Sequence, residues 1–164
     1  MSDAFSFLTE NVHVYRTATT PKEITTAAWR VIMNAQNLSL RFVRGAKMET
    51  VGELFDEFAA AFQFPYYFGE NWAAFDECIA DLEWIESDIY ITVITTASKL
   101  LANESLDQLD VFFKYVDKAA VEFAAQNKTF FVILQDAPGV RIRDLRYLGN
   151  TVTPVLDIDI SKHW

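Results

Sequence analysis

Few residues in this chain have side chains that could take part in covalent or metal chemistry. The histidines are His13 and His163, and the single cysteine is Cys78. His13 falls in an expected strand and His163 stands beside the C-terminus, with no motif around either, so we interpret both as structural or surface residues rather than general bases. Cys78 has apolar neighbours in an expected helix, which is typical of a small buried thiol rather than a nucleophile.

The remaining chemical candidates are the adjacent carboxylates Asp76 and Glu77. Neighbouring helix positions diverge by about 100°, so these groups converge poorly on one substrate atom. No histidine stands near them to complete a transition-metal site, and the chain has no P-loop, dinucleotide-binding glycine motif or nucleophile elbow. The sequence predicts no catalytic residue, no metal and no cofactor. An enzyme stays an alternative that would need a polar pocket containing His13, or a carboxylate pair with raised pKa values.

The negative charge of the chain is concentrated in one segment. Residues 48–98 contain eleven carboxylates and neither lysine nor arginine, whereas the net charge of the whole chain is −9, so the rest sums to +2. A field of this kind repels nucleic acid and attracts a basic partner, mainly by raising the association rate. A well-solvated acidic surface is the alternative interpretation.

Length and composition indicate one domain over residues 1–164. The chain is 51% hydrophobic and 15% aromatic, which is enough for a substantial core. One cysteine excludes an intramolecular disulfide and fits a reducing compartment. No secretory signal or membrane span is visible in the sequence. We therefore expect a cytoplasmic protein that is a monomer before it meets its partner and binds neither membranes nor nucleic acid.

Hydrophobic periodicity predicts strands alternating with helices, which implies an α/β fold with a central parallel sheet. The expected strands are 12–15, 38–43, 89–94 and 129–134, and the expected helices begin at Pro21 and after the cap Thr50 and then span 72–82 and 106–126. Beyond Pro138 the pattern weakens, and 140–143 with 155–158 are candidates for an edge hairpin.

The expected helix 72–82 presents two different faces, with Asn71 as its N-cap. Its core face consists of Trp72, Phe75, Ile79 and Leu82, and another face carries Ala73, Asp76, Glu77 and Ala80. No lysine or arginine stands four residues from either carboxylate, so the pair gains nothing for the helix itself. This favours a functional role for Asp76 and Glu77.

Residues 64–79 resemble the signature segment of the barstar family. The shared positions are Pro65, Tyr67, Gly69, Glu70, Asn71, Ala74, Phe75 and Cys78. The expected flanking elements agree as well, so the resemblance covers about residues 38–135. It leaves 1–37 as an N-terminal β-α extension and 136–164 as a C-terminal extension, either of which could complete the sheet, cover an edge strand or form a second contact surface.

The resemblance implies an intracellular inhibitor of a small basic ribonuclease, with a parallel sheet of three or more strands flanked by helices. In such a complex, carboxylates take the place of substrate phosphates and an aromatic ring stacks at the mouth of the active site. By position, Tyr67 would be that ring, Glu77 the dominant acidic anchor and Glu122 an accessory one. The expected partner-binding residues are Tyr67, Gly69, Asn71, Ala73, Asp76, Glu77, Ala80, Asp81 and Glu122.

The chain departs from the family pattern at several of these positions. Ala73 replaces a second helix aspartate, Asp76 stands where a tryptophan is frequent, and Phe68 replaces the second tyrosine. Glu77 is one methylene longer than aspartate, so Asp76 could share or take the anchoring role. The nuclease toxin that an immunity protein of this kind would bind is therefore left open, and the alternative is an acidic interaction module on the same fold with a non-nuclease partner.

Overall fold

A computed structural model describes residues 3–9, 11–34, 37–142 and 155–164. Its centre is a parallel sheet of five strands in the order β2-β3-β4-β1-β5. The strands are β1 (Val14–Thr17), β2 (Leu38–Arg44), β3 (Ile89–Thr95), β4 (Thr129–Gln135) and β5 (Val155–Asp157), and the α-helices are α1 (Pro21–Met33), α2 (Val51–Phe62), α3 (Trp72–Asp81) and α4 (Leu106–Ala125). The expected α/β fold with a parallel sheet is confirmed.

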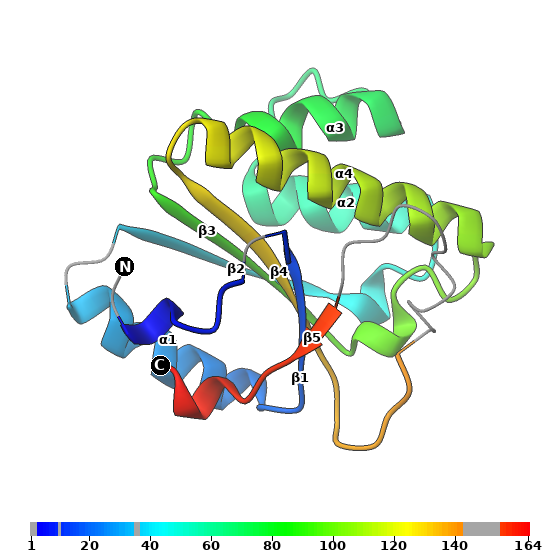
Figure 1. The fold of residues 1–164 in the computed structure, drawn as a ribbon. Coiled ribbons are helices and arrows are strands. Elements are labelled where there is room, and N and C mark those ends of the chain that lie inside the picture. Colours follow the sequence, from blue (N-terminus) through cyan, green and yellow to red (C-terminus); the bar gives the residue numbers. More distant parts are fainter. Residues whose placement is uncertain (1–2, 10, 35–36, 143–154) are drawn as a thin grey trace.

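The helices form two layers around the sheet (Figure 1). On one face α2, α3 and α4 close over an aromatic core in which Phe58, Phe75 and Phe112 are fully buried. On the other face α1 packs together with the short helices η1 (Asp3–Phe5) and η5 (Ile160–Lys162) over a smaller core around Tyr15 and Phe131. The sheet therefore separates two cores that are built from different parts of the chain.

Local sequence signals explain where α1 and α2 begin. Thr20 and Thr50 each accept a hydrogen bond from the backbone N–H of a glutamate three residues on, and that glutamate accepts one from the backbone N–H of the threonine. These reciprocal capping boxes satisfy backbone donors that the first helical turn leaves without partners. Pro21 at the first position of α1 adds a fixed φ angle where no N–H is needed.

The terminal segments complete the sheet. β1 and β5 lie beyond β4, so they widen the three strands β2, β3 and β4 to five. β1 begins at Val14 rather than at residue 12, which leaves His13 outside the strand. The expected edge hairpin is wrong in its pairing, because β5 runs parallel to β1 with Val14 opposite Val155, and 140–142 are not in a strand. Residues 143–154, including its expected turn, lie outside the described residues.

Candidate partner-binding site

The loop between α2 and α3 is fixed by a helix cap. Asn71 Oδ1 accepts a hydrogen bond from the backbone N–H of Ala74 at 3.0 Å, and Asn71 Nδ2 donates to the carbonyl of Gly69 at 3.0 Å. Glu70, not Gly69, adopts the left-handed backbone conformation, with φ at 48°. Gly69 instead allows a close approach, since a Cβ there would lie 3.0 Å from Asn71 Nδ2. The cap sets the direction in which α3 leaves the loop.

Two tyrosines project from this loop. Tyr67 is 72% exposed and Tyr66 is 100% exposed, with their rings in edge contact at a centroid separation of 5.5 Å. The next aromatic residue, Phe68, turns inward and packs edge-on against Phe55 and Phe64. The loop thus holds two exposed rings over a packed aromatic base. Adjacent exposed aromatic rings form an apolar patch of the kind that marks a site of interaction with a partner.

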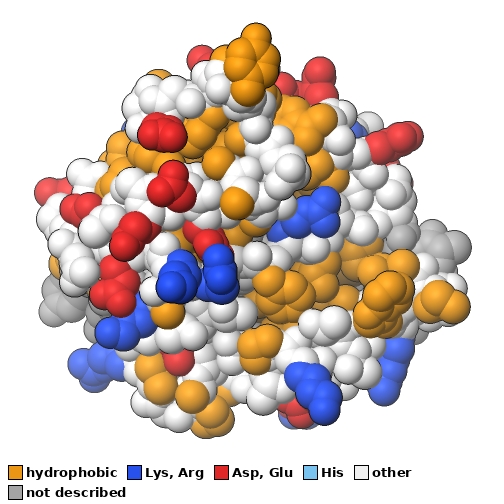
Figure 2. All heavy atoms as spheres, turned by 180° about the vertical axis from the view of Figure 1, so that it is seen from behind, with side chains coloured by type: hydrophobic (Ala, Val, Ile, Leu, Met, Phe, Trp, Pro, Cys, Tyr) orange, Lys and Arg blue, Asp and Glu red, His pale blue; other side chains and the backbone are white. Residues whose placement is uncertain are grey.

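A shallow groove of about 350 Å³ runs between α3 and α4. Its lining residues are Asp76, Glu77, Ala80 and Asp81 from α3 and Lys118 and Glu122 from α4. Four carboxylates and one ammonium give this groove a net charge of −3. Figure 2, seen from behind, shows acidic side chains gathered on the upper half of the molecule, where α2 and α3 lie, and apolar side chains projecting at its top.

Lys118 is the central cation of the groove. Its Nζ forms an ion pair with Asp76 Oδ2 and lies 3.8 Å from Glu122 Oε1. The hydrogen bond to Asp76 raises the pKa of Lys118, and the charges of Asp76 and Glu122 add to this while partial desolvation opposes it. The ammonium group therefore stays charged across the physiological range.

This ion pair overturns the expectation that Asp76 and Glu77 are both uncompensated. The Asp76 side chain is only 16% exposed, and its Oδ1 is buried without a hydrogen-bond partner. Glu77 is exposed and makes no ion pair within the described part of the chain. The expectation failed for Asp76 because its partner comes from another helix, which spacing along α3 cannot indicate.

The expected site residues fall into two neighbouring groups. Asp76, Glu77, Ala80, Asp81 and Glu122 line the groove, while Tyr67, Gly69 and Asn71 lie in the preceding loop and Ala73 is exposed on the first turn of α3. Ala80 is buried in the lining of the groove rather than exposed. The sequence predicts a contact segment over 66–81, which includes Tyr66, but it singles out neither Tyr66 nor Lys118. The sequence signal that could have indicated Lys118 is its i, i+4 spacing from Glu122.

The other chemical candidates lie outside this groove. Burial raises the pKa of Cys78, and the charges of Glu77 and Asp81 add to the effect, so the buried sulfur is held as a thiol. Burial also lowers the pKa of the half-buried His13, which keeps its imidazole neutral. His163 packs against Phe7 with 5.1 Å between ring centroids.

Neither a cluster of metal ligands nor a membrane-spanning helix is found among the described residues. Over 3–9, 11–34, 37–142 and 155–164, no three histidine, cysteine or carboxylate side chains are arranged so that they could hold a metal ion. None of the helices in these ranges has the length and apolarity that crossing a bilayer requires.

Comparison with known proteins assigns the chain to a family. A search of the curated proteins found no match. The family model described as barstar (barnase inhibitor) matches residues 38–135, which span β2 to β4 with α2, α3, α4 and the groove between α3 and α4. Because this match covers more than half of the sequence, the chain belongs to the barstar family.

Proposed function

We propose that this protein is an inhibitor that binds a basic ribonuclease one to one and blocks its active site. The tyrosine loop and the α3–α4 groove form the contact surface in this proposal. A ribonuclease cleft binds the phosphates of RNA with cationic side chains, and carboxylates at matching positions satisfy the same cations. An exposed tyrosine ring offers the flat face on which an RNA base or a histidine stacks.

The observation that carries the proposal is the excess of carboxylates over cations in the groove. Lys118 pairs with Asp76. Glu77 and Asp81 are exposed on the same side of α3, and Lys118 does not form an ion pair with either of them. Such charges do nothing for the isolated helix, but they steer a basic partner and form charge-assisted hydrogen bonds on contact. Glu77 is therefore the main anchor in the proposal, with Asp76 and Glu122 in accessory positions.

The test is capture of the partner, followed by an assay of what was captured. Wild-type protein, Glu77→Ala and Glu86→Ala are used as baits in a lysate of the source organism, Glu86 being an exposed carboxylate outside the groove. We expect wild type and Glu86→Ala to retain a basic protein that cleaves RNA and loses activity at one equivalent of inhibitor. Losing the desolvated Glu77 carboxylate should weaken binding by about 2–5 kcal/mol.

Two results would contradict this proposal. If Glu77→Ala retains the nuclease as well as wild type does, the contact surface lies elsewhere on the molecule. If the captured protein depends on Glu77 but does not cleave RNA, the chain is an acidic interaction module with a non-nuclease partner.

A further inference from the structure

A second cleft lies at the carboxyl ends of the strands, on the face of the sheet that α1 covers. It has a volume of about 740 Å³ and is bordered by the β1–α1 turn, the ends of β2 and β3, and the residues that follow β4. Figure 1 shows the chain leaving β1 and β4 at the bottom of the molecule, across the sheet from α3. In open parallel α/β sheets, small ligands bind at this edge of the strands.

The last residues of four strands form a polar row beside this cleft. Arg44 stands opposite Thr95 and Thr17 opposite Gln135, and the pairing of Ile94 with Leu134 brings Thr95 next to Gln135. Strand side chains alternate between faces, and Leu134 belongs to the core under α4, so Gln135 points to the side of α1. Polar side chains thus replace the apolar core where the sheet ends.

Gln135 is the feature that points most directly to a ligand. The residue is 7% exposed and lines the cleft, yet its side-chain amide makes no hydrogen bond within the described part of the chain. The amide lies at the surface of the cleft, where its donor and acceptor atoms are available to hydrogen-bond a ligand. A molecule in the cleft would supply the missing donor or acceptor.

The charged groups at the cleft favour an anion. Lys22 is exposed in the first turn of α1 and makes no ion pair with a described residue. Arg44 binds Glu57 through Nε and Nη2, which leaves Nη1 without an acceptor in the described ranges. Asp136 is the acidic residue of the lining, and its carboxylate accepts hydrogen bonds from the backbone N–H groups of Ser98 and Ala137.

The remaining walls suit a flat, partly apolar body. Phe42, Pro21 and Pro138 supply apolar surface, and Thr95 and Thr96 add hydroxyl groups at the rim. Aromatic and proline surfaces of this kind pack against rings, while the hydroxyl groups orient polar substituents.

We propose that this cleft binds a small organic anion with a polar ring, about the size of a mononucleotide. Lys22 and Arg44 bind the anionic group, and Gln135 hydrogen-bonds the polar edge of the ring. This site is separate from the α3–α4 groove and does not depend on the proposed inhibitor function.

The experiment uses the free, full-length protein and follows the side-chain amide signals of Gln135 by NMR. The probes are uridine 5′-monophosphate, orotate and uridine, which share a uracil ring. The first carries a phosphate on its ribose, the second a carboxylate on the ring, and the third no anionic group. We expect one or both anions, but not uridine, to shift the Gln135 amide signals. For the variants, binding is read from the backbone amide signals of Thr96 and Ala137 in the cleft lining. Lys22→Ala and Gln135→Met should each weaken binding by about fivefold to tenfold, and Lys114→Ala, on the other side of the sheet, should leave it unchanged.

Each alternative result would overturn the proposal. If neither anion shifts the Gln135 signals, or if uridine binds as tightly as its monophosphate, the cleft is not an anion site. If folded Gln135→Met and Lys22→Ala bind the anion as wild type does, the anion binds elsewhere. Because no nuclease is present, failure here leaves the inhibitor proposal untouched.

Discussion

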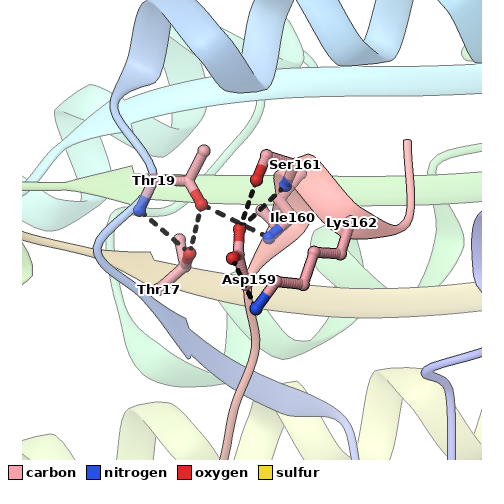
Figure 3. Close-up of polar contacts among 6 residues, drawn as sticks. All are labelled: Thr17, Thr19, Asp159, Ile160, Ser161 and Lys162. Carbon is pink, nitrogen blue, oxygen red and sulfur yellow. Dashed lines mark hydrogen bonds and ion pairs between the residues drawn. The ribbon is translucent and has the colours of Figure 1, made fainter.

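The α3–α4 groove and the C-terminal segment differ in how far their carboxylates are paired with cations. In the C-terminal segment, Asp157 accepts two hydrogen bonds from Arg16 at 2.6 and 2.8 Å. Asp159 accepts hydrogen bonds from the backbone N–H and hydroxyl of Ser161 and lies 3.1 Å from Lys162 Nζ (Figure 3). In the groove, Lys118 is the cation of the lining, and it pairs with Asp76 and Glu122 but not with Glu77 or Asp81.

The difference separates structural charges from charges available to a partner. A carboxylate with its own cation is already satisfied, and its role is to hold a segment in place. The segment after β5 is held in this way, with Thr19 accepting the backbone N–H of Ile160 as a further tie (Figure 3). The surplus carboxylates of the groove add repulsion to the free protein, which only an external cation relieves.

The largest expected effect is a loss of stability on removing a ring from the core beneath α3. Phe75 is fully buried and contacts a set of five rings, namely Phe55, Phe58, Phe64, Trp72 and Phe112. Phe75→Ala should lower the free energy of unfolding by about 3–5 kcal/mol, because it removes a ring that α3 places in the core. Urea unfolding followed by circular dichroism measures this change.

A matched variant on the other face sharpens that comparison. Phe131 is buried among Phe5, Phe7 and Tyr15, so Phe131→Ala should destabilise the protein to a similar extent. Under conditions where both variants are folded, only Phe75→Ala should weaken capture of the partner, since Phe75 supports the helix that carries Glu77. Equal loss of partner binding in both would mean that the α3–α4 side has no special part in recognition.

The order of elements and their starting points could be predicted from the sequence, since those signals are local. Each of these signals involves only a few neighbouring positions, as do the caps Thr50 and Asn71 and the apolar period of α3. The barstar family match covers residues 38–135, which include these positions. Those predictions concern contacts between residues close in the chain, where helix and turn geometry leaves few alternatives.

The parts that could not be predicted depend on tertiary contacts. Lys118 reaches Asp76 from 42 residues away, and nothing in either helix alone indicates this pairing. β5 adds to β1 in parallel, although its alternation fitted a hairpin strand equally well. Glu70 takes the left-handed conformation although Gly69 stands beside it, and glycine adopts that conformation at a lower cost.

Lys118 offers an intermediate test of the groove. Lys118→Met removes the central cation and changes the groove charge from −3 to −4, so a basic partner should associate about two to three times faster at low salt. High salt should abolish the difference, because screening removes long-range steering. Stopped-flow measurement of the association rate checks this, with Lys114→Met on the exposed side of α4 as the control.

A slower association for Lys118→Met would reverse this interpretation. Lys118 would then be needed to hold Asp76 in the position that the partner recognises. The double variant Lys118→Met/Asp76→Asn separates the two roles, since it removes both charges of the pair and keeps the shapes of the side chains. Recovery of the wild-type rate in the double variant would assign the loss to the uncompensated Asp76 carboxylate.

The smallest expected effect lies in the C-terminal segment. The hydrogen bonds from Arg16 hold the pKa of Asp157 below its ordinary value, so the pair stabilises the folded state above that ordinary value and loses its contribution as the pH falls through the lowered pKa. Both side chains are substantially exposed, at 45% and 72%, so Asp157→Asn should cost less than about 1 kcal/mol at neutral pH. Hydrogen exchange of the Ile158 amide, which donates to the Arg16 carbonyl, should report faster opening of β5 in this variant. The difference from wild type should vanish at acid pH, where the wild-type carboxyl group is protonated as well. If the difference persists there, the ion pair is not what holds β5 to the sheet, and its backbone ladder to β1 carries the attachment.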